Sequence, residues 1–192
     1  RSGDVSIGSS AAARGAARVV RDCAKRKFLA PASTDMPIDC DSIATGDAMP
    51  VFVIRPTLRH AVMYAAAMWE FQRIHYDDTY AREQEGLPGA VVQGPVLGNY
   101  LTQAIAAWTG PEGALKRLEW RNHGLVAFGD DIRCEGSVLA ARPGSGDGRK
   151  SVRVECALQM LNQRNEKVVS ATATVDIRAA DGTRPAANGG MK

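Results

Sequence analysis

The sequence predicts an α+β domain in which one antiparallel sheet wraps around a long central helix. Two observations lead to this fold class. Residues 95–108 carry apolar side chains nearly all round a helical repeat, which is typical of a buried helix. After residue 115 the pattern changes to alternating, strand-like runs at hairpin spacing, and a sheet of such strands must bury one face. The helix is its natural partner.

The elements before the central helix are predicted in chain order. Residues 46–56 read as a turn followed by an edge strand. Residues 57–71 form a helix with Thr57 as its N-cap. Its apolar face is expected to consist of residues at three- and four-residue spacing, namely Leu58, Val62, Ala65 and Trp69. Residues 79–87 form a short helix, and we expect Asp77 to cap its start.

The central helix and the strands complete the predicted domain. Gly94-Pro95 opens the helix, because proline suits a first helical turn, and Gly110 ends it. Four strand-like runs follow at residues 115–130, 131–142, 151–163 and 166–179. Because short turns separate these runs, we expect them to form an antiparallel meander.

Composition limits the classes of function. Of the 192 residues 45% are hydrophobic and 23% are charged, which suits one domain with a packed core. The net charge is only +3 and no basic run is interleaved with aromatics, so we expect no nucleic-acid partner. No run approaches the roughly 18 apolar residues of a membrane helix, so we expect no membrane partner. With no secretion signal visible, the cytoplasm is the expected compartment.

Three segments are expected along the chain. Residues 1–40, rich in alanine and arginine, form an N-terminal extension whose order the sequence does not define, with one amphipathic helix over 11–27. Residues 41–182 form the folded domain, and 183–192 form a flexible tail. The four cysteines show no metal-type spacing, and those within strand-like runs, Cys134 and Cys156, are expected to be buried free thiols.

The chemistry-bearing residues gather in residues 69–100. Glu70 lies five residues before His75, in a polar break between two helical segments, and Gly94 lies at the start of the central helix. A carboxylate at a helix end and a histidine past a turn can flank one water molecule. Backbone N–H groups at the start of a buried helix suit an oxygen that gains negative charge.

This stretch resembles the signature of the MaoC-like (R)-specific enoyl-CoA hydratases and dehydratases. That signature runs Asp-x-Asn-Pro-x-His-x-Asp and is followed further on by Ala-His-Gly-Met. Residues 70–77, EFQRIHYD, fall on the first part, and residues 92–95, VQGP, fall on the second. The resemblance covers roughly residues 44–180 and is closer to the hydroxyacyl-thioester dehydratase branch. It implies a single hotdog domain.

The matches and departures define the expected site. His75, Asp77 and Gly94 keep the family's residues. The family's Asp, Asn, Pro and second His are replaced here by Glu70, Gln72, Arg73 and Gln93. The resemblance implies that His75 transfers the proton, that Glu70 or Gln72 positions the water, and that the N–H of Gly94 or its neighbour holds the thioester oxygen. The residues expected to bind substrate are Gln93, Pro95, Tyr100 and Arg73.

Other polar and aromatic residues are expected to have structural or supporting roles. His60, beside Arg59 in the first helix, is expected at the surface or with its hydrogen bonds satisfied, and His123 has no assigned role. Tyr100 and Trp108 are expected in the core or in a tunnel wall. Positive charge for coenzyme A has three candidates, Arg73, Arg82 and Arg121.

The resemblance implies hydration of 2-enoyl thioesters, or dehydration of 3-hydroxyacyl thioesters, carried on coenzyme A or an acyl carrier protein. No metal-ligand cluster or glycine-rich phosphate loop is present, so we expect no metal and no other cofactor. The expected assembly is a homodimer, or a heterodimer with a second hotdog chain. Two alternatives stay open: a non-catalytic subunit that shapes the acyl site of a partner hydratase, and a thioesterase on the same fold.

Overall fold

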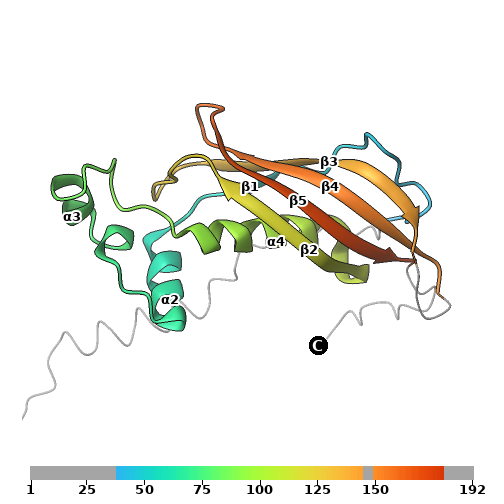
Figure 1. The fold of residues 1–192 in the computed structure, drawn as a ribbon, viewed down its shortest axis with the longest axis horizontal. Coiled ribbons are helices and arrows are strands. Elements are labelled where there is room, and N and C mark those ends of the chain that lie inside the picture. The colour runs from blue at the N-terminus through green and yellow to red at the C-terminus, as the bar shows by residue number, and fades with distance from the viewer. Residues whose placement is uncertain (1–37, 145–148, 180–192) are drawn as a thin grey trace, which may run out of the picture. The chain divides into compact units, whose positions relative to one another are not determined.

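The computed structural model describes residues 38–144 and 149–179 (Figure 1). All of these residues belong to one compact unit, Ser33–Lys192. The predicted tail at 183–192 and nearly all of the predicted extension at 1–40 lie outside the described residues. The proposed domain boundaries therefore stay predictions.

One antiparallel sheet holds all the strands of the described residues, in the order β1-β3-β4-β5-β2. The strands are β1 (Phe52–Ile54), β2 (Gly113–Asn122), β3 (Ile132–Pro143), β4 (Ser151–Leu161) and β5 (Lys167–Arg178). Each of the four predicted strand-like runs contains one of the strands β2 to β5, and β1 is the predicted edge strand.

The predicted meander is correct for β3, β4 and β5 and wrong for β2. Instead of pairing with β3, β2 lies at the far edge and pairs with β5, from Gly113 opposite Ile177 to Asn122 opposite Val169. The connection between β2 and β3 hydrogen-bonds to another segment: the N–H of Val92 donates to the carbonyl of Val126 at 2.8 Å. Because this connection pairs with the segment before the central helix, it cannot form a tight hairpin between β2 and β3.

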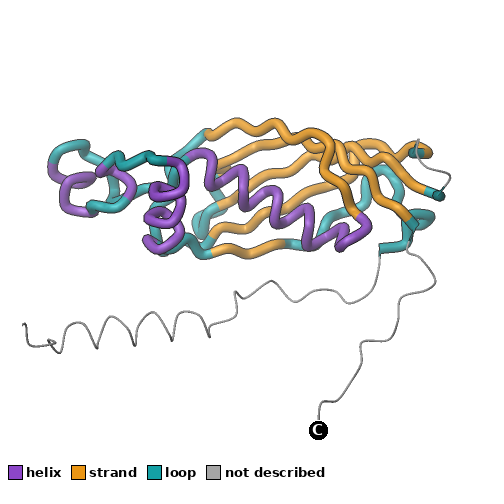
Figure 2. The backbone as a smooth tube through the Cα atoms, turned by 90° about the horizontal axis from the view of Figure 1, so that it is seen from below, coloured by secondary structure: helices purple, strands orange, loops and turns teal. Residues whose placement is uncertain are grey.

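The central helix α4 (Gly94–Thr109) lies across one face of this sheet (Figure 2). Its buried side chains include Val96, Leu97, Leu101, Ala104 and Ile105. They meet the inward residues of β4 and β5, which alternate with outward ones as a half-buried strand requires. The structure confirms the predicted α+β class with a sheet wrapped around one long helix.

A second helix, α2 (Leu58–Met68), buries small residues rather than large ones, and its His60 side chain contacts Tyr100 of α4. Ala61 and Ala65 are each 1% exposed, whereas the predicted face residues Leu58, Val62 and Trp69 are 46%, 50% and 84% exposed. The predicted apolar face is therefore wrong except at Ala65. The larger side chains are turned outward. Thr57 is the N-cap, as predicted, although its side chain makes no capping hydrogen bond.

Two short helices follow α2, namely the 3-10 helix η1 (Arg73–His75) and α3 (Asp78–Glu83). The carboxylate of Asp77 accepts a hydrogen bond from the backbone N–H of Tyr80 at 3.0 Å, which confirms the predicted cap. Asp77 also accepts from Arg73. These bonds hold the pKa of Asp77 below its ordinary value.

The cysteines of the sheet are structural. Cys134 and Cys156 are buried and free, as predicted. Burial raises the pKa of Cys134 to about 12 and that of Cys156 to about 11, so both thiols stay protonated near neutral pH. Within the described part of the chain, no helix has the length and apolar character needed to cross a bilayer.

Candidate active site

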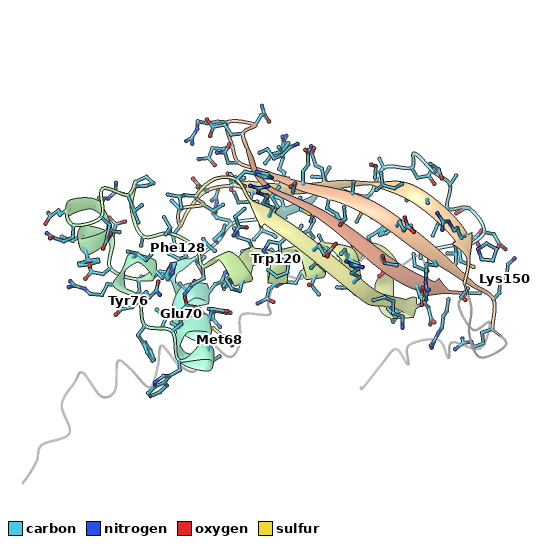
Figure 3. The ribbon with its side chains drawn as sticks, in the orientation of Figure 1. Met68, Glu70, Tyr76, Trp120, Phe128 and Lys150 are labelled. Atoms are coloured by element: carbon cyan, nitrogen blue, oxygen red, sulfur yellow. The ribbon has the colours of Figure 1, made fainter. Side chains whose placement is uncertain are left out.

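The end of α2 fixes where Glu70 lies. Trp69 adopts the left-handed conformation (φ 56°, ψ 36°), and its N–H donates to the carbonyl of Ala65. The N–H of Glu70 donates to the same carbonyl at 3.0 Å. This pair of bonds closes the helix and turns the chain, which is how a left-handed C-terminal residue commonly ends a helix. Figure 3 shows Glu70 beside the end of α2.

Backbone contacts fix His75 in place. Its N–H donates to the carbonyl of Gln72 at 3.1 Å, and its ring Nδ1 lies 2.8 Å from the carbonyl oxygen of Val91. A carbonyl oxygen only accepts, so Nδ1 carries the proton and donates it to Val91. The neutral ring therefore keeps its lone pair on Nε2, the state that a general base requires. The residue is 8% exposed.

His75 and Glu70 converge as the sequence predicts. Nε2 of His75 lies 4.0 Å from Oε1 of Glu70, and the two side chains are 10% and 32% exposed. This distance is too long for a direct hydrogen bond. A water about 2.8 Å from both atoms would make an angle of roughly 90° between them, close to what its hydrogen bonds prefer. The pair can therefore hold one water and exchange a proton with it.

Val91 connects His75 to the start of α4. Val91, which accepts the His75 ring proton, is three residues before Gly94. Gly94 is half-buried and Pro95 is exposed in the first turn. Within residues 38–144 and 149–179, the N–H of Gly94 has no hydrogen-bond acceptor. A free N–H at the positive end of a helix is suited to an anionic oxygen.

The residues predicted to bind substrate from α4 lie deeper. Gln93 is 1% exposed, and its Nε2 donates to the carbonyl of Ala61 at 3.2 Å. Its Oε1 is buried and has no partner among the described residues. Tyr100 is 4% exposed, and its hydroxyl oxygen forms a hydrogen bond with Nδ1 of His60 at 2.9 Å. Both residues lie in the interior, and substrate contact by either stays a prediction.

Burial keeps the pair of Tyr100 and His60 neutral. Desolvation raises the pKa of Tyr100 to about 12. Desolvation, with the nearby charge of Arg59, lowers the pKa of His60. His60 thus has the satisfied position predicted for it, and Tyr100 lies in the core as expected. Trp108 packs partly buried against the same core.

The remaining predicted residues lie on the outside. Gln72 is exposed, and its side chain makes no hydrogen bond within the described residues, although its carbonyl caps His75. The guanidinium of Arg73 is bound to Asp77 at 2.8 Å and lies 4.1 Å from the centre of the Tyr80 ring. A surface hollow of about 390 Å³ beside Arg73 is lined by residues other than His75, Glu70 and Gly94.

Of the three arginines suggested for coenzyme A, two are already paired. Arg73 binds Asp77, and Arg82 binds Asp78 at 2.8 Å. Arg121 has no ion-pair partner among the described residues. In the same part of the chain, no group of three or more His, Cys, Asp or Glu side chains is arranged to hold a metal ion.

The sequence interpretation missed Asn122. This residue ends β2, and its side-chain Nδ2 lies against Gly94 at the start of α4. The available signal was weak, since an asparagine that ends a strand-like run usually marks a turn. Its place beside Gly94 depends on the pairing of β2 with β5, which places β2 against the helix.

Comparison with known proteins identifies relatives by sequence. The sequence model of a family described as hydroxyacyl-thioester dehydratase type 2 matches residues 25–128. A mesaconyl-C(4)-CoA hydratase of Chloroflexus aurantiacus is 32% identical over 83 residues, which are 43% of this chain. The match spans only 29% of that hydratase's length.

Comparison with solved structures identifies the fold. The R-hydratase PhaJ1 of Pseudomonas aeruginosa matches with a TM-score of 0.64 at 22% identity, over 80% of this chain and 97% of that one. A MaoC domain dehydratase of Chloroflexus aurantiacus, described as putative, matches with a TM-score of 0.66 at 18% identity, over 84% of this chain and 46% of that one. At these identities the likeness shows the fold alone, and that fold is the hotdog fold.

Proposed function

The chain belongs to the hydroxyacyl-thioester dehydratase type 2 family, and on that premise we propose that it hydrates 2-enoyl thioesters or dehydrates 3-hydroxyacyl thioesters. Coenzyme A or an acyl carrier protein would carry the acyl group. One observation carries the proposal more than any other: Nε2 of His75 and Oε1 of Glu70 lie 4.0 Å apart, in a position to hold one water.

In the hydration direction, His75 removes a proton from the water. Nε2 accepts that proton while the water oxygen bonds to Cβ of the enoyl group. The electron pair of the C=C bond then moves toward the thioester, which gives an enolate. The imidazolium returns its proton to Cα, so hydroxyl and hydrogen have been added and the ring is neutral again. Dehydration follows the same steps in reverse.

Glu70 has an electrostatic role in this proposal. Its carboxylate accepts the second hydrogen of the water and thereby directs the oxygen lone pair toward Cβ. It also lies close enough to Nε2 to stabilise the imidazolium that forms in the step. Glu70 replaces the aspartate of the family signature and retains its chemistry on a longer side chain.

The start of α4 would hold the enolate oxygen. The free N–H of Gly94 can donate to it, and the helix dipole favours its negative charge. In other enzymes the loss of one such donor lowers the rate on the order of a hundredfold or more. His75 would thus transfer the proton, and Gly94 would stabilise the enolate oxygen.

We also propose that the chain works as a pair, with a second copy or with another hotdog chain. Strand β2 is ten residues long, and within the described residues it pairs only with β5. A long free strand edge is a common place for a second chain to add. Trp120 and Leu115 on β2 remain 41% and 36% exposed. The matched parts of the chain cover only 29% and 46% of the two Chloroflexus proteins.

A second candidate function is a non-catalytic subunit that shapes the acyl site of a partner. The exposed, unbonded side chain of Gln72 favours it, because the family signature has asparagine there. The position of Glu70 beside His75 favours catalysis instead. The absence of a cofactor and the cytoplasmic location stay predictions.

One assay separates the candidates. The purified chain is incubated with a panel of 2-enoyl-CoA and 3-hydroxyacyl-CoA thioesters, and both the enoyl absorbance and the release of free thiol are followed. We expect the enoyl absorbance to fall without thiol release. Thiol release would instead identify a thioesterase. No turnover by the chain alone, with turnover gained when a co-purified hotdog partner is added, would identify a shaping subunit.

A further inference from the structure

Asn122 and Gly94 lie side by side although 28 positions separate them in the sequence. A Cβ added to Gly94 would come within 2.8 Å of the side-chain Nδ2 of Asn122. Asn122 is the last residue of β2, and Gly94 is the first residue of α4. The amide of Asn122 therefore lies beside the backbone at the positive end of the helix.

Two neighbouring elements fix this contact. Trp120 and Asn122 are two residues apart on β2 and so point to the same face of the strand. Gly94 and Gly98 are four residues apart on α4 and lie on one side of the helix. The Trp120 ring would be 2.7 Å from a Cβ on Gly98, just as Asn122 meets Gly94. Figure 3 shows Trp120 beside α4.

Polar groups at this place lack partners. Within residues 38–144 and 149–179, neither the N–H of Gly94 nor the side chain of Asn122 makes a hydrogen bond. The buried Oε1 of the adjacent Gln93 also has none. The first N–H groups of a helix have no partner within the helix, so the N–H of Gly94 and the amide of Asn122 are adjacent donors that a ligand can use. Solvent reaches it, since Asn122 is exposed and Gly94 is half-buried.

We propose that Asn122 Nδ2 is a second hydrogen-bond donor to the thioester oxygen, beside the N–H of Gly94. This inference rests on the proposed hydration of enoyl thioesters. Two adjacent N–H donors can both point at one oxygen that has two lone pairs, and the carbonyl oxygen of a thioester is such an atom. The oxygen becomes negative as the enolate forms, so both donors act most strongly in the transition state.

The test compares Asn122→Ala and Asn122→Asp with wild type. Asn122→Ala removes the donor, and we expect kcat to fall on the order of a hundredfold while KM changes little. Asn122→Asp keeps the shape but brings negative charge to the enolate, so its loss should be larger. Asn122→Ser, which keeps a donor, should recover part of the rate. Glu119→Gln on the opposite face of β2 is the matched control, because Glu119 pairs with Arg117 on the outside.

A second measurement does not depend on hydration. A 3-oxoacyl-CoA thioester ionises to an enolate with its own ultraviolet absorbance, and the protein should raise the enolate fraction of the bound thioester. Asn122→Asp should abolish that increase, and Glu119→Gln should preserve it. Circular dichroism and thermal melting confirm that each variant is folded.

The outcomes separate this inference from the proposed function. If wild type hydrates enoyl thioesters while Asn122→Ala and Asn122→Asp match it in both measurements, the role of Asn122 is wrong and the function stands. If wild type stabilises the enolate through Asn122 but hydrates nothing, the role stands and the function is wrong. If wild type neither hydrates nor binds these thioesters, both are wrong.

Discussion

Nε2 of His75 lies 4.0 Å from Oε1 of Glu70, and backbone hydrogen bonds hold the chain at both residues. The N–H of Glu70 donates to Ala65, and the N–H of His75 donates to Gln72. The separation is therefore set by the end of α2 and by η1 rather than by attraction between the two side chains. A water between them would meet a preorganised pair.

Replacing Glu70 by glutamine tests the carboxylate. The side chain keeps its shape but loses the charge that orients the water and stabilises the imidazolium, so kcat should fall well beyond about threefold. Glu70→Asp shortens the side chain and should also lower kcat, because a misplacement of about 1 Å can cost on the order of a hundredfold. Steady-state hydration of an enoyl-CoA measures both, with Glu83→Gln on α3 as control. A loss below about threefold in Glu70→Gln would reduce Glu70 to a structural role.

Replacing Gly94 by alanine should separate activity from stability. The backbone conformation of Gly94 allows alanine, which favours a helix over glycine by up to about 1 kcal/mol. The new methyl group, however, would meet Asn122 Nδ2 at 2.8 Å and crowd the free N–H. We expect an equal or higher melting temperature and a loss of kcat/KM on the order of tenfold or more. Asn99→Ala, at an exposed position of α4, is the control, and unchanged kcat/KM in Gly94→Ala would exclude an oxyanion site there.

Local signals in the sequence predicted much of this structure. The start of α4 at Gly94 and the cap at Asp77 follow from the residues themselves, and the four long strands follow from alternation. The signature predicted the convergence of His75 and Glu70. Contacts between distant segments could not be predicted from these local signals. The pairing of β2 with β5, and with it the position of Asn122, depends on the path of the connection after β2.

The buried face of α2 is a second feature that the sequence pattern did not predict. Periodicity predicted a buried face of large apolar residues, yet the buried residues of the helix are Ala61 and Ala65. Hydrophobicity alone does not say which face of a helix is buried, and the face buried here carries small side chains. Four-residue spacing fits both faces of α2, so the period could not choose between them.

This packing gives a stability prediction. Ala65→Leu would force a large side chain between α2 and its neighbours, and such overpacking typically costs about 1–3 kcal/mol of unfolding free energy. Ala66→Leu, one position on and exposed, should change stability little. Urea unfolding of both variants measures the difference. Equal stability of the two variants would mean that Ala65 does not lie in a tight contact.

The cap at Asp77 predicts a pH dependence of stability. Bonds from the Tyr80 N–H and from Arg73 hold the pKa of Asp77 below its ordinary value of 3.8. A carboxyl group with a depressed pKa in the folded state stabilises the fold above that ordinary value, and the contribution is lost as pH falls through the folded-state pKa. Asp77→Ala should therefore melt at a lower temperature than wild type at neutral pH. The difference should shrink in acid, and a difference independent of pH would contradict the charged cap.

The central claim is that His75 carries the proton of the hydration reaction. The most direct measurement is the rate of 2-enoyl-CoA hydration by His75→Ala and His75→Gln beside the His123→Ala control, with circular dichroism to confirm folding. His123 is exposed and bonded to Ser170, so its loss should leave the rate unchanged. We predict that both His75 variants lose at least about a hundredfold in kcat. A folded His75→Ala protein that hydrates at the wild-type rate would contradict the account.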